Sequence, residues 1–406
     1  SCGNFLEEYS QDLVYAQSCE DLDEILIGNG YMAQPTTPSY FSYGDKAFYY
    51  PYLHVMDDDI EEYLTGNANI SSSINPVTTL RNFYIWAKEP FMRISGLTFR
   101  DYDWKRMYEH IGYLNVIISY VKEFHEDSEE MRHRILGEAQ FLRAGYYFML
   151  VNLYANPYSK ETADATMGVP LNLTEYIEEG YFSRDPVAAV YRQIVTDLEN
   201  AIVNLSGIKQ PTIYRVNEKA ARALLSRVYL YMGEWQLVID ECDEIIKMGC
   251  SLWDLNNFDP GTATFGCKRD YFLAKESPEI FFTQGAGVVG LLMDNQNITS
   301  QTRYRASDEL YGIYSKYEKD GILDLRKNCF FEMSKRDNGY FFVRKNPMFD
   351  ATVFDSFLLR SGEIYLNKAE AQAMLDQADA INTMKELMNK RYADHKLPVI
   401  DGLSGK

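Results

Sequence analysis

Two groups of residues in this chain have the side-chain types that bind metal ions. Asp57, Asp58 and Asp59 are consecutive carboxylates, and hard cations such as calcium take several oxygen ligands. No glycine stands at the turn, so we interpret the run as the solvated cap of a following helix. His125 and His133 flank an acidic stretch, but their spacing matches no histidine-based zinc motif. We therefore predict no metal site.

Motifs of known catalytic chemistry are missing from the sequence. It contains no G-x-S-x-G, no P-loop and no H-E-x-x-H. Carboxylate pairs could hydrolyse a glycoside only if they faced each other across a cleft, and an acidic chain contains many pairs by chance. We therefore predict no enzymatic activity and no cofactor.

The cysteines indicate free thiols. Five of them form no C-x-x-C pair and are odd in number, which argues against a zinc site or a disulfide framework: Cys19, Cys242, Cys250, Cys267 and Cys329. The sixth, Cys2, follows Ser1 at the start of the chain. A cysteine at that place is either the acylated first residue of a bacterial lipoprotein or a chance occurrence.

The charge balance excludes one class of partner. A net charge of −19 argues against nucleic acid, because a phosphate backbone requires a basic face. It argues equally against docking to an anionic lipid surface. The longest apolar-rich run, residues 144–159, contains Asn152, Asn156 and Pro157 and is too short and too polar for a transmembrane helix.

A 34-residue stretch, 217–250, has the period of a tetratricopeptide helix pair. Asn217 is a suitable cap for the first helix. Gly233 breaks the apolar pattern at the turn, and Gly249 stands where a left-handed stop is expected. A helix pair of this kind is a scaffold, so it favours binding over catalysis.

Other helices follow from the same 3.6-residue periodicity. We predict them at about 20–28, 102–124, 129–154 with Ser128 as cap, 186–205 with Asp185 as cap and Pro186 in the first turn, and as a pair at 360–391. Residues 29–100 and 250–358 are predicted as loop-rich, with short strands at 279–284 and 340–345. The predicted fold is mostly α: helix pairs at about 102–250 and 360–391 form a scaffold for these two regions.

Three helical segments resemble the SusD/RagB family. They are L-G-E-A-Q-F-L-R-A at 136–144, V-Y-R-Q-I-V-T-D-L at 190–198 and A-A-R-A-L-L-S-R-V-Y-L-Y-M-G-E-W at 220–235. The W-x-x-M-Y-x-x-I-x-x-L-N of 104–115 and the L-N-K-A-E-A of 366–371 are also similar to the family. The resemblance spans nearly the whole chain and implies a single SusD-like domain over 1–406. The family's usual C-terminal tail, with E-G-x-R-x-x-D-L, is missing from the sequence.

The resemblance implies a cell-surface glycan-binding lipoprotein without catalytic activity. Proteins of this family are anchored by lipid to the outer membrane of Bacteroidetes, which would make Cys2 the lipidation site after removal of a signal peptide. They deliver an oligosaccharide, or in RagB-type members a peptide, to a SusC-like TonB-dependent transporter. The expected partners are this transporter and the ligand; the lipid is the sole membrane contact, and nucleic acid is excluded.

Sugar binding requires flat aromatic rings beside polar groups that meet the hydroxyls. Arg81, Tyr84 and Trp86 lie within one short stretch, predicted to be irregular, where family members often place binding aromatics. Asp294, Asn295, Gln296 and Tyr304 provide the complementary polar groups in the second loop-rich region. Tyr40, Tyr43 and Tyr49 are candidates for the rim, whereas Trp104, Trp235 and Trp253 are expected in the core. For Trp86 the alternative is an anchor that holds a long loop to the core.

Two other classes of protein remain as alternatives. A polysaccharide-cleaving enzyme would turn over a glycan. A pure protein-interaction module would bind a peptide in the groove of its helix pairs and would need no small ligand.

Overall fold

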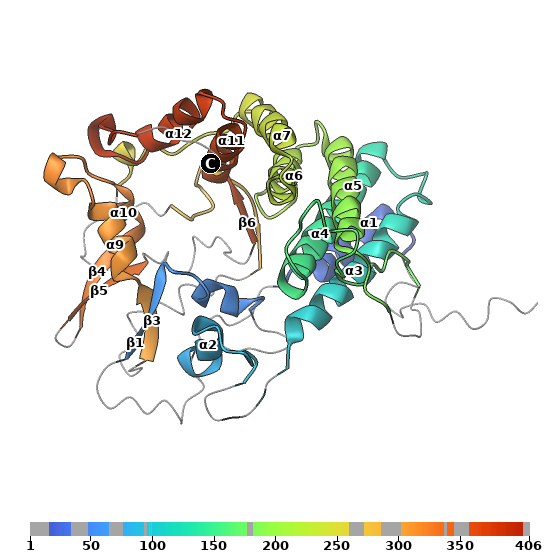
Figure 1. Ribbon diagram of the computed structural model, residues 1–406. Coiled ribbons are helices and arrows are strands. Elements are labelled where there is room, and N and C mark those ends of the chain that lie inside the picture. Colours follow the sequence, from blue (N-terminus) through green and yellow to red (C-terminus); the bar gives the residue numbers. More distant parts are fainter. Residues whose placement is uncertain are drawn as a thin grey trace, which may run out of the picture.

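The computed structural model describes residues 16–33, 48–64, 76–92, 96, 98, 100–176, 182–259, 272–285, 302–336, 339–344 and 357–400 (Figure 1). Its α-helices are α1 (Cys19–Ile25), α2 (Pro76–Tyr84), α3 (Tyr102–Tyr120), α4 (Glu129–Tyr154), α5 (Val187–Leu205), α6 (Glu218–Met232), α7 (Trp235–Lys247), α9 (Asp308–Ser315), α10 (Arg326–Phe330), α11 (Ser361–Met374) and α12 (Asp379–Asn389). Shorter helical turns are η1 (Leu26–Gly30), η2 (Pro51–Val55), η3 (Leu255–Asn257), η4 (Glu318–Asp320) and η5 (Ala393–His395).

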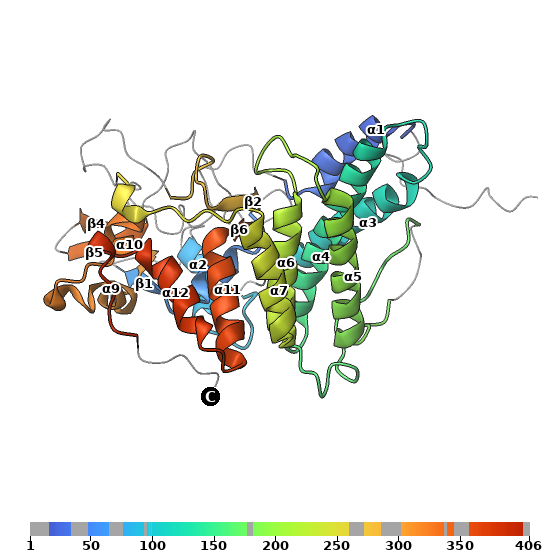
Figure 2. The same ribbon diagram turned by 90° about the horizontal axis from the view of Figure 1, so that it is seen from above.

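Seven of these helices form a continuous stack. Each of α3, α4, α5, α6, α7, α11 and α12 packs against the next, and Figure 2 shows the stack from above. Helix α11 lies directly on α7, although residues 248–360 separate them in sequence. The mostly α fold predicted from the sequence is confirmed, and the stack is the scaffold of the molecule.

The helix ends of the scaffold follow local capping chemistry. Ser128 accepts a hydrogen bond from Met131 N at 3.1 Å, and Asn217 accepts one from Ala220 N at 3.0 Å. Gly233 ends α6 with φ of +70°, a conformation that glycine adopts without steric cost. These predicted caps are confirmed because each depends only on residues within one helical turn.

Two predicted helix boundaries are wrong. Helix α3 ends at Tyr120, four residues before the predicted 124. Pro186, with extended backbone, is the N-cap residue of α5. Asp185 does not cap the helix, because its Oδ2 accepts a hydrogen bond from Leu171 N at 2.7 Å. A tertiary hydrogen bond thus replaces the predicted local cap.

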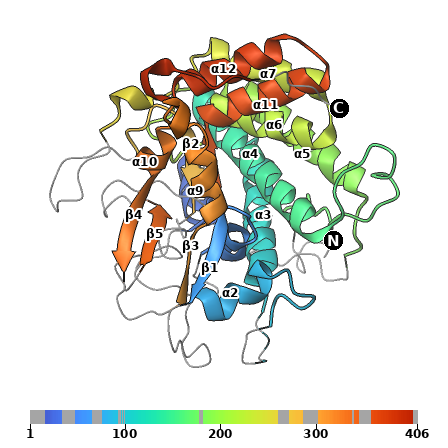
Figure 3. The same cartoon turned by 60° about the vertical axis from the view of Figure 1, so that its left-hand side comes forward.

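The two regions predicted as loop-rich contain more regular structure than expected. They contribute α2, α9, α10 and strands β1 (Ile60–Leu64), β2 (Ile280–Gln284), β3 (Thr302–Ala306), β4 (Phe331–Arg336), β5 (Gly339–Arg344) and β6 (Phe357–Arg360). The strands form three antiparallel pairs, β1–β3, β2–β6 and β4–β5. Figure 3 shows α2 beside β1 and β3.

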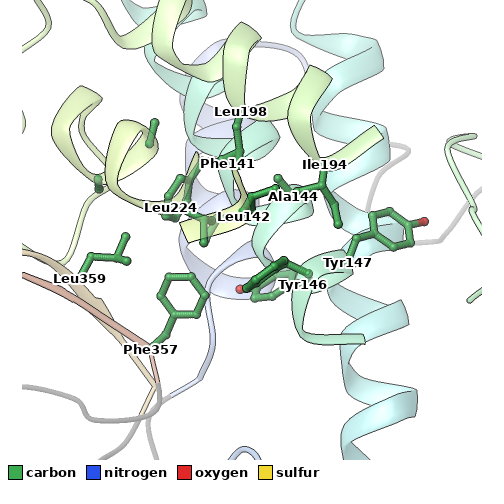
Figure 4. Packing of buried hydrophobic residues seen from close by; sticks show 14 of the residues in the cluster. Phe141, Leu142, Ala144, Tyr146, Tyr147, Ile194, Leu198, Leu224, Phe357 and Leu359 are labelled. Carbon is green, nitrogen blue, oxygen red and sulfur yellow. The ribbon is translucent and has the colours of Figure 1, made fainter. Parts of the chain in front are cut away.

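One core joins the scaffold to the second of these regions. In Figure 4, Phe141 and Leu142 of α4 lie with Leu224 of α6 and Phe357 of β6. The ring of Phe282, on the fully buried strand β2, lies 5.3 Å from that of Phe141 and 5.9 Å from that of Phe357. Burial of these rings fixes β2 and β6 against the helices.

Within the described part of the chain, no helix combines the length and apolar character needed to cross a membrane.

Candidate functional site

The end of α2 places an aromatic side chain in an unusual backbone conformation. Trp86 N donates to Phe83 O at 3.0 Å, and Ala87 N donates to Asn82 O at 2.8 Å. These two bonds form a Schellman motif, in which Trp86 occupies the left-handed position usually held by glycine. Its φ is +50°, which costs a bulky residue roughly 1–2 kcal/mol. Strain of this kind is concentrated at functional sites.

Trp86 is also the most exposed tryptophan of the protein. Its side chain is 71% exposed, whereas Trp104, Trp235 and Trp253 are partly buried. The ring of Trp104 lies 4.8 Å from that of Tyr154, and Trp253 lies 5.0 Å from Phe258. The alternative that Trp86 anchors a loop to the core does not hold in this structure, since the ring faces solvent.

Tyr84 lies on a buried tyrosine from a distant part of the chain. Its ring is 5.5 Å from that of Tyr304, which has no exposed surface. Pairing of β1 with β3 brings Tyr304 opposite Glu62 and beneath α2. Burial raises the pKa of Tyr304, so its hydroxyl stays protonated, and among the residues that the structure describes that hydroxyl has no hydrogen-bond partner. Tyr304 therefore supports Tyr84 from below rather than meeting a ligand directly.

Arg81 is held by an ion pair. Its Nε lies 3.1 Å from both carboxylate oxygens of Glu62, and its side chain is 37% exposed. Glu62, with a side chain 9% exposed, thus orients Arg81 beside Tyr84. The prediction that Arg81 and Tyr84 lie in an irregular stretch is wrong, because both belong to α2.

An aromatic cluster beneath α2, not predicted from the sequence, fixes the helix in place. The ring of Phe83 stacks on Tyr52 of η2, with centres 4.4 Å apart and planes at 10°. Phe91 meets the edge of Phe83 at 5.1 Å. Asn82 Nδ2 donates to Met92 O at 2.5 Å and closes the loop that follows. In the sequence, the clustering of aromatic residues at 48–52 and 83–91 is the feature that could have indicated this packing.

We use the name aromatic platform for Arg81, Tyr84 and Trp86 with their supports Glu62 and Tyr304. Four residues predicted to bind the ligand lie in this platform: Arg81, Tyr84, Trp86 and Tyr304. Of these, Tyr304 is buried. Asn295 and Gln296, with Asp294, lie outside the described residues, as do Tyr40, Tyr43 and Cys2. Tyr49, predicted at the rim, is buried and its hydroxyl contacts His110 Nε2 at 3.0 Å.

The acidic run at 57–59 precedes strand β1 rather than the predicted helix. Burial raises the pKa of Asp59, and the neighbouring carboxylates of Asp57 and Asp58 raise it further. Among the residues that the structure describes, no group of three or more His, Cys, Asp or Glu side chains is placed to hold a metal ion.

Two cavities open on the scaffold side rather than at the platform. One, of about 570 Å³, lies among α11, α12 and the segment after α7 and is lined by Cys250, Leu252, Tyr365, Glu386, Asn389, Lys390 and His395. The other, of about 540 Å³, adjoins the start of α4 and the ion pairs of Arg134 and Arg215. Neither of these two cavities is lined by a platform residue.

Comparison with known proteins gives consistent matches. A SusD-like family described as "Starch-binding associating with outer membrane" matches residues 56–230. The SusD-like protein P25 of Formosa agariphila is 26% identical over 253 residues, which cover 61% of this chain and 43% of that protein. The aligned part of the chain thus spans less than half of that relative's length.

Solved structures share the fold. A SusD superfamily protein from Bacteroides thetaiotaomicron superimposes with a TM-score of 0.68 at 21% identity, covering 93% of this chain and 81% of that one. A laminarin-binding SusD-like protein superimposes with a TM-score of 0.56 at 19% identity, over 96% of this chain and 84% of that one. The chain is thus similar to SusD-like proteins: the family model matches residues 56–230, and the solved structures share its fold.

Proposed function

We propose that this protein binds an oligosaccharide on the aromatic platform and does not cleave it. The observation that carries the proposal is Trp86: an exposed indole held in a strained conformation beside Tyr84. Pyranose rings present apolar faces that pack on flat aromatic rings, while a guanidinium and carboxylates can bond to hydroxyls. The description of the matched family and the laminarin-binding neighbour favour a glycan as the ligand.

The cellular role follows from the family as part of the same proposal. The protein is anchored to the cell surface by a lipid on Cys2 and passes its ligand to a SusC-like TonB-dependent transporter. Asn295 and Gln296 complete the ligand contacts from the second loop-rich region. A peptide ligand is the second candidate, since RagB-type relatives carry peptides.

Calorimetric titration with laminarin and starch oligosaccharides tests the binding site. Trp86→Ala should weaken binding about fivefold or more, because a stacked aromatic contributes roughly 0.5–1.5 kcal/mol beyond the area that it buries. Phe182→Ala is the matched control, since Phe182 is also an exposed aromatic, at 47%, but lies before α5. Equal affinity of Trp86→Ala and wild type would move the site elsewhere.

Two further measurements separate the alternatives. Product analysis after incubation with the same glycans should find no shorter sugars; reproducible release by the pure protein would establish an enzyme instead. Displacement of a bound glycan by peptides, or binding of peptides alone, would establish the peptide ligand.

A further inference from the structure

Three polar side chains on one face of α3 hold the segment that leads to the platform. Asp103, Arg106 and His110 are spaced by three and four residues, so they project from the same side of the helix. All three contact residues 48–50, which directly precede η2. Asp103 and Arg106 are buried there as an ion pair.

Each residue of 48–50 has its own contact with this face. Arg106 Nη2 donates to Phe48 O at 2.9 Å, and the guanidinium lies 4.0 Å from the ring centre of Tyr49. Asp103 Oδ2 accepts from Tyr50 N at 3.1 Å. His110 Nδ1 lies 2.5 Å from a carbonyl oxygen of η1, so it carries the proton, and Nε2 accepts from the Tyr49 hydroxyl at 3.0 Å.

The held segment adopts a strained turn that aims η2 at the platform. Tyr50 has φ of +46° and ψ of +46°, which an L-residue with a large side chain adopts only when its surroundings impose it. Two residues later, Tyr52 stacks on Phe83. The carbonyl of Phe83 accepts the hydrogen bond that fixes Trp86. A contiguous set of contacts therefore runs from α3 to the exposed indole.

We propose that Asp103 and Arg106 are positioning residues for the aromatic platform, and that the charge of Asp103 governs how firmly Trp86 is held. The inference rests on the proposed function and concerns the regulation of that site. Loss of the carboxylate charge weakens both the ion pair with Arg106 and the bond from Tyr50 N. The turn at Tyr50 then relaxes, and Tyr52 and Phe83 follow.

The surroundings of Asp103 cause its carboxylate to lose its charge at mildly acidic pH. Burial raises the pKa of Asp103 to about 6; Arg106 opposes the rise and Asp101 adds to it. From α4, Tyr154 donates to Asp101 at 2.6 Å and stays neutral, because burial raises its own pKa. Burial holds the pKa of His110 below its ordinary value, although the bond to Asn29 O opposes this shift, so the uncharged imidazole is favoured. Affinity should therefore fall as the pH drops from about 7.5 to about 5.

The test compares three variants at both pH values, with laminarin as the titrated probe. Asp103→Asn removes the charge, and the double variant with Arg106→Gln also removes the counter-charge, so that no unpaired buried ion remains if the single variant folds poorly. Glu109→Gln is the control on the same helix, where exposed Glu109 pairs with Lys105 at 3.2 Å. A second readout needs no ligand: fluorine NMR of fluorotryptophan-labelled protein, with the Trp86 signal assigned by Trp86→Phe.

The expected result is an affinity about threefold or more weaker at the lower pH for wild type and Glu109→Gln, and a flat, weak profile for both Asp103 variants. The Trp86 signal should shift with pH in wild type and stay fixed in the Asp103 variants. A wild-type profile that persists in the double variant, or a Trp86 signal that ignores pH, would overturn the inference. If laminarin fails to bind wild type at either pH, laminarin is not the oligosaccharide of the proposed function, and the fluorine signal decides the inference by itself.

Discussion

Helices α6 and α2 end with the same pair of hydrogen bonds around different residues. At the end of α6, the amides of Gly233 and Glu234 donate to carbonyls three and five residues earlier, at 3.1 and 2.9 Å. At the end of α2, the amides of Trp86 and Ala87 do the same at 3.0 and 2.8 Å. Both central residues are left-handed, with φ of +70° and +50°.

Helix α6 thus uses the residue that adopts this conformation without steric cost, and α2 uses the largest side chain available. A tryptophan at this position gains nothing for the helix end itself, since glycine makes the same bonds. An exposed indole at this position fits the surface role proposed for Trp86. The following predictions separate residues that hold the fold from residues that present a surface.

The largest effect is expected in the shared core. Phe282→Ala removes a fully buried ring that joins β2 to α4, so the free energy of unfolding should fall by about 3–5 kcal/mol. Urea denaturation measures it. Trp86→Ala is the comparison and should change this free energy by less than about 1 kcal/mol, because its ring is mostly solvated. Similar losses in both variants would mean that Trp86 is part of the core.

An intermediate effect is expected at the junction of α1 with α4. Asp23 bonds Arg134 at 3.0 Å and pairs with Arg215, and both arginines also pair with buried Glu138. Asp23→Asn should lower the free energy of unfolding by about 2 kcal/mol at neutral pH.

The effect at Asp23 should depend on pH. Burial acts to raise the pKa of Asp23, but Arg134 and Arg215 outweigh it and hold the pKa below its ordinary value. The stabilisation is therefore present above the unfolded value of about 3.9 and is lost as the pH falls through the lower folded value. Thermal unfolding of both proteins over this range checks it; a difference that stays constant into strong acid would contradict the role of the charge.

The smallest effect on the free energy of unfolding is expected at the ends of α6 and α2. Gly233→Ala should lower the free energy of unfolding by about 1 kcal/mol, because alanine pays for the left-handed conformation that glycine adopts freely. For the same reason Trp86→Gly should be about 1 kcal/mol more stable than Trp86→Ala, while both lose ligand affinity. A glycine variant no more stable than the alanine variant would show that the backbone at Trp86 is not strained.

The scaffold and the platform also differ in how much of their structure could be predicted from the sequence. Caps at Ser128 and Asn217 and the stop at Gly233 depend on neighbours within one turn, so the scaffold could be predicted from local pattern. Helix α2 could not, since it has only nine residues and its place depends on Tyr52 and Phe91. Tyr304 was expected at a ligand surface because nothing local reveals that β3 pairs with β1 and lies under α2.

The direct packing of α7 on α11 has a consequence for how such proteins diversify. The chain leaves the helix stack after α7 and returns to it at α11, and β2 pairs with β6 beside α6 and α11. The entropy of closing a loop rises only with the logarithm of its length, so lengthening or replacing the middle of this segment costs the stack little. Changes of length between β2 and β6 are therefore expected to leave the stack intact, whereas β2 and β6 themselves stay fixed in the shared core.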